Sequence, residues 1–103
     1  MDDHRLEKIR KLVLRGNWIP SQHVIEDYLI TGECTREDIE QSVLTGRIYK
    51  VEKDPIGTAL DGKVYTISGK SVYGLGFETA GKIIKRPDGN FYFVITAYKY
   101  RRT

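Results

Sequence analysis

Cysteine is nearly absent from this 103-residue sequence, which contains only Cys34. A single thiol excludes a disulfide within the chain and leaves zinc without the paired thiols of most structural sites. Neither the two histidines nor the acidic residues show the spacing of metal ligands, and no glycine pattern forms a phosphate-binding loop. The sequence therefore predicts no metal ion and no other cofactor.

Long apolar runs are absent as well. No stretch approaches the roughly 18 apolar residues of a membrane span, and the polar residues 1–5 lack the apolar core of a signal peptide. Hydrophobic residues make up 40% and charged residues 30% of the chain, which is the balance of a globular domain. We expect a cytoplasmic protein without membrane contact, folded as one domain over residues 1–103.

Acidic residues are scarce in the second half of the chain. Beyond Asp61 the only acidic residues are Glu78 and Asp88. The basic residues of the same segment are Lys63, Lys70, Lys82, Lys85, Arg86, Lys99, Arg101 and Arg102. This asymmetry fits a partner that is RNA, DNA or an acidic protein, whereas a solvated basic edge would need no partner.

Apolar residues recur at helical spacing through the first half of the chain. Ser21 is a typical N-cap, and Thr35 with Asp38 forms a capping-box pattern. Gly46 is expected to end the last helix in the left-handed conformation, and residues 17–20 are interpreted as an apolar link. The helices are expected over residues 3–15, 21–31 and 36–45.

The second half changes to the period-two alternation of strands. Residues 47–52, 63–69 and 91–100 each predict one strand, whereas the glycines in residues 71–86 indicate either one bulged strand or two shorter ones. A Pro-Asp-Gly-Asn turn at residues 87–90 predicts that the last two elements are antiparallel neighbours.

The last predicted strand carries different side chains on its two faces. Alternation separates Phe91, Phe93, Ile95 and Ala97 from Tyr92, Val94, Thr96, Tyr98 and Tyr100. We expect the first set to pack against the helices, and the Tyr-rich set to form an open, partly polar face. The pattern also places this strand inside the sheet rather than at its edge.

Together these elements predict an α+β domain. Two or three N-terminal helices should pack on one face of a mostly antiparallel sheet of about four strands. The helical half is expected over about residues 3–46 and the sheet half over about residues 47–100. A DNA-binding module is disfavoured because the second and third helices are acidic where a groove-reading helix should be basic.

Three short motifs resemble a known family. They are Ser21-Gln22-His23 at a helix start, Gly46-Arg47-Ile48 before the first predicted strand, and Val-Ile-Thr-Ala-Tyr at residues 94–98. Across about residues 18–99 the chain resembles a family of small bacterial proteins catalogued as domain of unknown function four-two-five-eight. That family looks like a distant relative of the RelE and BrnT ribonuclease toxins of toxin–antitoxin loci. The resemblance implies a RelE-like or barnase-like fold and a ribonuclease activity.

RNA cleavage without a metal ion needs a base for the 2′-hydroxyl, an acid for the leaving 5′-oxygen and cations for the charged phosphorane. His23 lies in the first turn of a helix, where the dipole favours the neutral imidazole. Its alternative role is structural, as a helix cap or a side chain packed under the sheet. The candidate catalytic residues are His23, Thr96 and Tyr98, and the candidate substrate-binding residues are Lys63, Lys82, Lys85, Arg86 and Lys99.

These predictions favour a toxin-like endoribonuclease or RNA-binding protein. Its candidate partners are RNA, an acidic antitoxin-like protein and a second copy of the chain. The alternative is a non-catalytic module that docks another protein on a basic, Tyr-rich sheet face.

Overall fold

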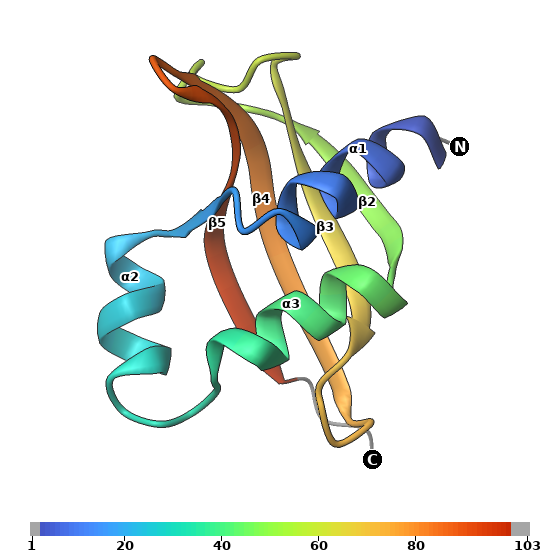
Figure 1. Ribbon diagram of the computed structural model, residues 1–103, viewed down its shortest axis with the longest axis vertical. Helices are drawn as coiled ribbons and strands as arrows, with labels where there is room; N and C mark the ends of the chain where they lie inside the picture. Colours follow the sequence, from blue (N-terminus) through green and yellow to red (C-terminus); the bar gives the residue numbers. More distant parts are fainter. Residues whose placement is uncertain (1–2, 100–103) are drawn as a thin grey trace.

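The computed structural model describes residues 3–99, in which helices cover one face of a five-stranded sheet (Figure 1). The helices are α1 (Asp3–Leu14), α2 (Gln22–Val24, continued by the π-helical turn η1, Ile25–Leu29) and α3 (Arg36–Thr45). The strands are β1 (Trp18–Pro20), β2 (Arg47–Lys53), β3 (Lys63–Lys70), β4 (Gly76–Arg86) and β5 (Gly89–Lys99). Figure 1 shows α1 and α3 across the same face of the sheet and α2 beside β5. The predicted α+β class is confirmed.

The sheet contains one strand that the sequence did not predict. Its order is β1-β5-β4-β3-β2, with β1 parallel to β5 and the other neighbours antiparallel. Residues 17–20 are therefore not merely a link, because the Tyr92 N–H donates to the Asn17 carbonyl and the Ser21 N–H to the Val94 carbonyl. Three residues that include a proline are too short to show a period-two pattern. As expected, β5 lies inside the sheet, between β1 and β4.

The helix boundaries follow the predicted caps. Gly16, with φ of 78°, ends α1, and the Asn17 N–H closes the cap on the Leu12 carbonyl. Thr35 and Asp38 form the complete capping box of α3. The prediction for Gly46 was wrong, because its φ of −91° is not left-handed.

The predicted assignment of the two faces of β5 was wrong for residues 91–94, before the bulge, and correct for residues 96–98, after it. Tyr92 and Val94 are fully buried on the side that meets the helices, whereas Phe91 and Phe93 are only half-buried. Ile95 forms a bulge, since Val94 pairs with Gly81 and Thr96 with Ala80 on β4. The bulge changes the alternation, so buried Ala97 is on the helix side although it is three residues from Val94. Tyr100 lies outside the described residues.

Two glycines allow α3 to lie close to the sheet. A Cβ on Gly69 of β3 would be 2.0 Å from the Ser42 carbonyl oxygen of α3, and a Cβ on Gly46 would be 2.7 Å from the Ser68 carbonyl oxygen of β3. Both contacts are with backbone, which cannot rotate away as a side-chain end can. Close helix-to-sheet packing, rather than a left-handed turn, therefore explains the glycine at position 46.

Gly69→Ala should destabilise the protein by about 3 kcal/mol, because α3 must move away from the sheet to admit the methyl group. Gly74→Ala is the matched control. Its Cβ would meet nothing within 4 Å, but its φ of +80° is unfavourable for alanine, which should cost about 1 kcal/mol. Urea unfolding at neutral pH measures both values, and equal costs would contradict the packing argument.

Candidate functional site

Ser21 joins α2 to β5 at the Ile95 bulge. Its N–H donates to the Val94 carbonyl at 2.9 Å, and its hydroxyl donates to the Ile95 carbonyl at 2.8 Å. The same hydroxyl accepts from the Val24 N–H at 3.2 Å, which makes Ser21 the N-cap of α2 as predicted. The first turn of α2 is therefore held against the part of β5 that leads to Thr96 and Tyr98.

His23 projects from this first turn and is paired with Asp27. The Nδ1 atom of His23 lies 2.8 Å from the Asp27 carboxylate, and the two side chains are 51% and 58% exposed. The ring also meets Tyr28 edge to face, with the ring centroids 5.4 Å apart. His23 is thus neither the helix cap nor packed under the sheet. A carboxylate on Nδ1 orients the imidazole and fixes the proton there, so that Nε2 is the ring nitrogen available to accept a proton.

Thr96 and Tyr98 lie on the sheet face that α1 and α3 leave open. Thr96 pairs with Ala80 and Tyr98 with Glu78 on β4, in positions that alternate with the buried Phe77 and Thr79. The Tyr98 hydroxyl donates to the Glu78 carboxylate, and the residue is 40% exposed. Thr96 and Tyr98 therefore lie on the same surface. The contacts of Ser21 with Val94 and Ile95 hold the first turn of α2 next to this part of β5.

Lys82 is not the surface cation that the sequence suggested. Its ammonium lies 3.1 and 3.2 Å from the two Asp54 carboxylate oxygens, and the two side chains are only 3% and 1% exposed. Its charge is neutralised inside the protein, so we correct its role from RNA binding to structural pairing. Composition alone does not reveal this pairing, because Asp54 is 28 residues away from Lys82 in the chain.

Asp54 is the centre of the loop between β2 and β3. It accepts hydrogen bonds from the Ile56 and Ala59 N–H groups as well as from Lys82. Burial alone would raise the pKa of Asp54, but the hydrogen bonds from Ala59, Lys82 and Ile56 and the attraction of the Lys82 charge together lower the pKa to about 2. The carboxylate therefore holds the loop in place as an ion.

Three other predicted cations, Lys63, Lys85 and Arg86, lie away from Tyr98. Lys85 pairs with Asn90 near the β4–β5 turn, and Arg86 with Gly89. Asn90 and Tyr98 are eight residues apart on β5, which is about 25 Å at the usual rise of a strand. Lys63 pairs with Lys53 at the start of β3, and Lys99 pairs with Phe77 but its side chain lies outside the described part of the chain. The structure therefore does not bring Lys63, Lys85 or Arg86 to Thr96 and Tyr98.

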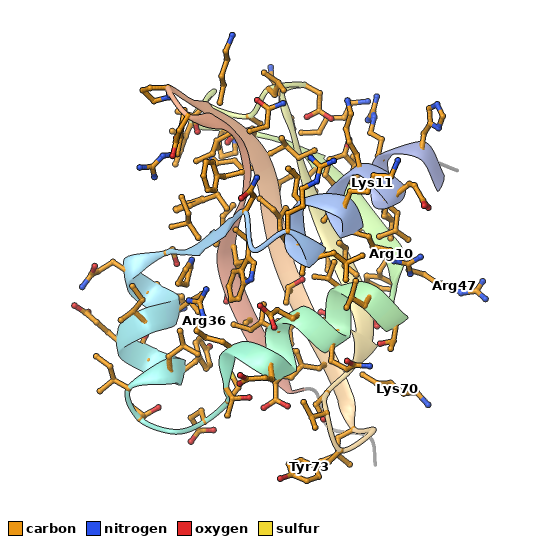
Figure 2. The ribbon with its side chains drawn as sticks, in the orientation of Figure 1. Arg10, Lys11, Arg36, Arg47, Lys70 and Tyr73 are labelled. Carbon is orange, nitrogen blue, oxygen red and sulfur yellow. The ribbon has the colours of Figure 1, made fainter. Side chains whose placement is uncertain are left out.

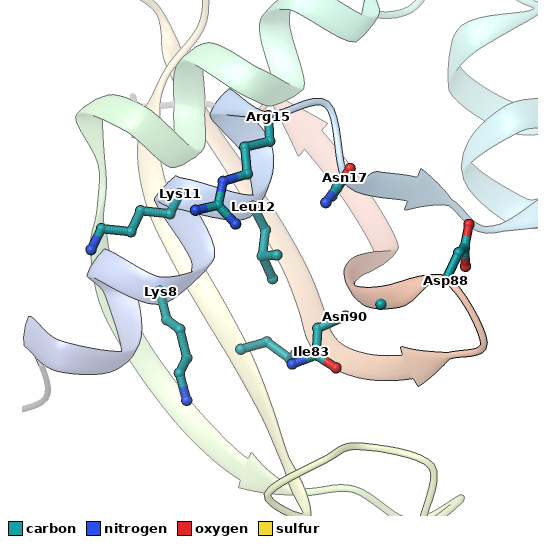
Figure 3. Close-up of a pocket in the computed structure, with 9 residues that line it drawn as sticks. Lys8, Lys11, Leu12, Arg15, Asn17, Ile83, Asp88 and Asn90 are labelled. Carbon is teal, nitrogen blue, oxygen red and sulfur yellow. The ribbon is translucent and has the colours of Figure 1, made fainter.

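Sequence reasoning missed two basic surfaces. A cavity of about 400 Å³ lies between α1 and the β4–β5 turn and is lined by Lys8, Lys11 and Arg15 (Figure 3). A second hollow of about 420 Å³ is lined by Arg47 and Lys70 near the exposed Tyr49. Figure 2 shows Arg47 and Lys70 directed outward from the same side of the molecule. The first of these surfaces could have been predicted from the sequence. Lys8, Lys11 and Arg15 are three and four residues apart, which places all three on one face of the helix.

Residues 3–99 contain no group of three or more histidine, cysteine, aspartate or glutamate side chains placed to hold a metal ion. Nor does any helix within this range have the length and apolar character needed to cross a membrane.

The protein is therefore an α+β domain with helices on one face of a mixed five-stranded sheet and an exposed His–Asp pair on the helix that Ser21 joins to β5. No protein-family model matches the chain, and no curated protein or solved structure matches it significantly. The functional argument consequently depends on the residues of this chain.

The Asp54–Lys82 pair predicts a specific pH dependence. The folded-state pKa of Asp54, about 2, is below its ordinary value of 3.8, so the unfolded chain binds this proton more readily. The stabilisation is complete above about pH 4 and is lost as the pH falls toward about 2. Asp54→Asn should therefore be less stable than the unmodified protein at pH 7, and the difference should shrink between about pH 4 and pH 2.

Urea unfolding across this pH range measures the effect. The control is Asp88→Asn, because Asp88 is exposed and its contact with Arg86 is long, at 4.0 Å. A difference between Asp54→Asn and the unmodified protein that stays constant from pH 7 to pH 2 would contradict the ionised, hydrogen-bonded state of Asp54.

Proposed function

We propose that this protein binds RNA and cleaves it without a metal ion, with His23 as the base. The observation that carries the proposal is the exposed imidazole of His23, which Asp27 holds at 2.8 Å through Nδ1. In the reaction, Nε2 takes the proton of a 2′-hydroxyl, and the 2′-oxygen attacks the adjacent phosphorus. The 5′-oxygen then leaves with a proton from water, which gives a 2′,3′-cyclic phosphate and a 5′-hydroxyl.

The open sheet face supplies the surface on which the RNA would lie. Phe93 and Tyr98 present partly exposed rings on this face, and aromatic rings are sequence-tolerant platforms for unpaired bases. Thr96 adds a hydroxyl between them. Because the Tyr98 hydroxyl is engaged by Glu78, we assign the Tyr98 ring, rather than its proton, the larger role.

The motifs at residues 21–23, 46–48 and 94–98 are the basis of the resemblance to a family that looks like a distant relative of the RelE and BrnT ribonuclease toxins, and they favour the same activity. The resemblance also suggests an acidic antitoxin-like protein as the partner that silences the activity, and action in the cytoplasm. The basic surfaces around Arg15 and Arg47 offer complementary charge to such a partner.

A second candidate function is protein docking, favoured by the turn between β3 and β4. Tyr73 is 87% exposed, and its neighbours Val72 and Leu75 are 52% and 58% exposed. The turn is nevertheless held in place, since the Val72 N–H donates to Asp38 and the Leu75 N–H to the Ser71 hydroxyl. Figure 2 shows Tyr73 projecting from the end of the molecule. Exposed apolar side chains on a fixed turn are typical of an interface anchor.

Purified protein should cut RNA but not DNA in the presence of EDTA, and the products should end in 2′,3′-cyclic phosphate. His23→Ala should lower the rate by about 100-fold or more, because it removes the proton acceptor. Asp27→Asn should cause a smaller loss of about tenfold, because the imidazole loses its orienting carboxylate. Gel analysis of labelled oligoribonucleotides measures the rates, and thermal unfolding should show nearly unchanged stability for both variants.

The matched control is His4→Ala, which removes the other, exposed histidine from α1. Equal activity of the His23→Ala and His4→Ala variants would exclude His23 as the base. If the protein cuts no RNA and a binding partner is lost only on Tyr73→Ala, the docking function replaces the ribonuclease.

A further inference from the structure

The cavity between α1 and the β4–β5 turn has the composition of a site for an anion. Lys8, Lys11 and Arg15 stand on the face of α1 that borders it, while Leu12 and Ile83 form an apolar floor. Figure 3 shows the Lys8 side chain running toward Ile83, the Arg15 guanidinium turned toward Leu12, and the Lys11 ammonium directed away. A volume of about 400 Å³ lies within the usual range of small-ligand pockets.

No side chain that the structure describes neutralises the charge of these three cations. All three side chains are exposed, and none forms an ion pair within residues 3–99. The single acidic group on the cavity rim is Asp88, which is 4.0 Å from Arg86. The rim is thus positively charged, and cations placed around a concave surface raise the local concentration of anions.

Backbone hydrogen bonds fix the end of α1 that borders the cavity and join it to β5. The cap at Gly16 fixes the end of α1, because Gly16 and Asn17 donate to the Val13 and Leu12 carbonyls. The Asn17 carbonyl in turn accepts from the Tyr92 N–H, which joins this end of the helix to β5. Polar groups of Asn17 and Asn90 therefore border the cavity on fixed backbone, where they can add hydrogen bonds to a ligand oxygen.

We propose that this cavity binds the phosphate group of a nucleotide, with Lys8 and Arg15 as the main charged contacts and the Leu12–Ile83 floor under the sugar or base. Arg15 can bind two phosphate oxygens at once, and Lys8 acts as a point charge. The phosphate can belong to a free mononucleotide or to an RNA chain. Only the second source depends on the proposed ribonuclease function. In that case the cavity lies at the Asn17 end of β1 and the His23 helix at its Ser21 end, so that the RNA would follow this edge of the sheet.

Binding measurements with two probes separate the sources of the phosphate. Calorimetry tests uridine 5′-monophosphate, and fluorescence anisotropy tests a labelled 2′-O-methyl oligoribonucleotide, which cannot be cleaved because its 2′-oxygen is blocked. Lys8→Ala and Arg15→Ala should each weaken binding by about five- to tenfold at low salt. Lys11→Ala should weaken binding less, since Lys11 points away from the cavity.

Two further variants test the sign and the location of the effect. Asp88→Asn should strengthen binding by about two- to fivefold, because it removes a negative charge from the rim. Lys53→Ala on β2 makes the same charge change as Lys8→Ala at an exposed residue outside the cavity lining and should have a smaller effect.

If the mononucleotide binds and the variants change its affinity as predicted, the cavity is a nucleotide pocket. If only the oligonucleotide binds, with the same effects of the variants, the cavity is a subsite for the RNA backbone. Either result supports the phosphate site. His23→Ala should leave binding of the mononucleotide unchanged, because the cavity lining does not include His23, so that failure of the ribonuclease proposal would not be confused with failure of this one. Equal effects of Lys8→Ala and Lys53→Ala, or no effect of Asp88→Asn, would overturn the assignment.

Discussion

Three hydrogen bonds made by Ser21 connect the two parts of this protein that a function would use. One residue binds two consecutive carbonyls of β5, at Val94 and Ile95, and at the same time caps the helix that carries His23. The Ile95 bulge reverses the alternation of β5 at this point, so that Thr96 and Tyr98 face the open side of the sheet. The position of the imidazole and the orientation of the neighbouring strand therefore depend on the same junction.

Charge is divided between structural and accessible groups in a way that composition does not reveal. Lys82 is buried with Asp54, and its pairing secures a loop rather than a ligand. In contrast, Lys8 and Arg15 of α1 remain exposed around a cavity that the β4–β5 turn completes. A basic half of the sequence is thus not the same as a basic surface. The basic side chains that line the cavity beside α1 are Lys8, Lys11 and Arg15. All three belong to the helix that the sequence predicted over residues 3–15, not to the basic second half of the chain.

Features set by neighbouring residues could be predicted from the sequence, whereas features set by distant contacts could not. The caps at Ser21 and Thr35 depend on side chains three residues apart, and both were predicted correctly. The face on which Tyr92 lies depends on a distant residue, because its ring packs over Gly81 of β4. A Cβ at position 81 would be 2.6 Å from that ring. Strand β1 could not be predicted, because what makes it a strand is its pairing with β5, more than 70 residues away in the chain. The sequence identified His23 as a candidate base, whereas the pairing of its Nδ1 atom with the Asp27 carboxylate is seen only in the structure.

The location of bound RNA tests the central claim most directly. Backbone amide resonances can be followed by NMR while a 2′-O-methyl oligoribonucleotide is added in the presence of EDTA. The proposed function predicts that the largest changes occur in residues 21–27 and 96–98, on the two sides of the Ser21 junction. Changes confined to residues 71–75, or no change at saturating RNA, would contradict it.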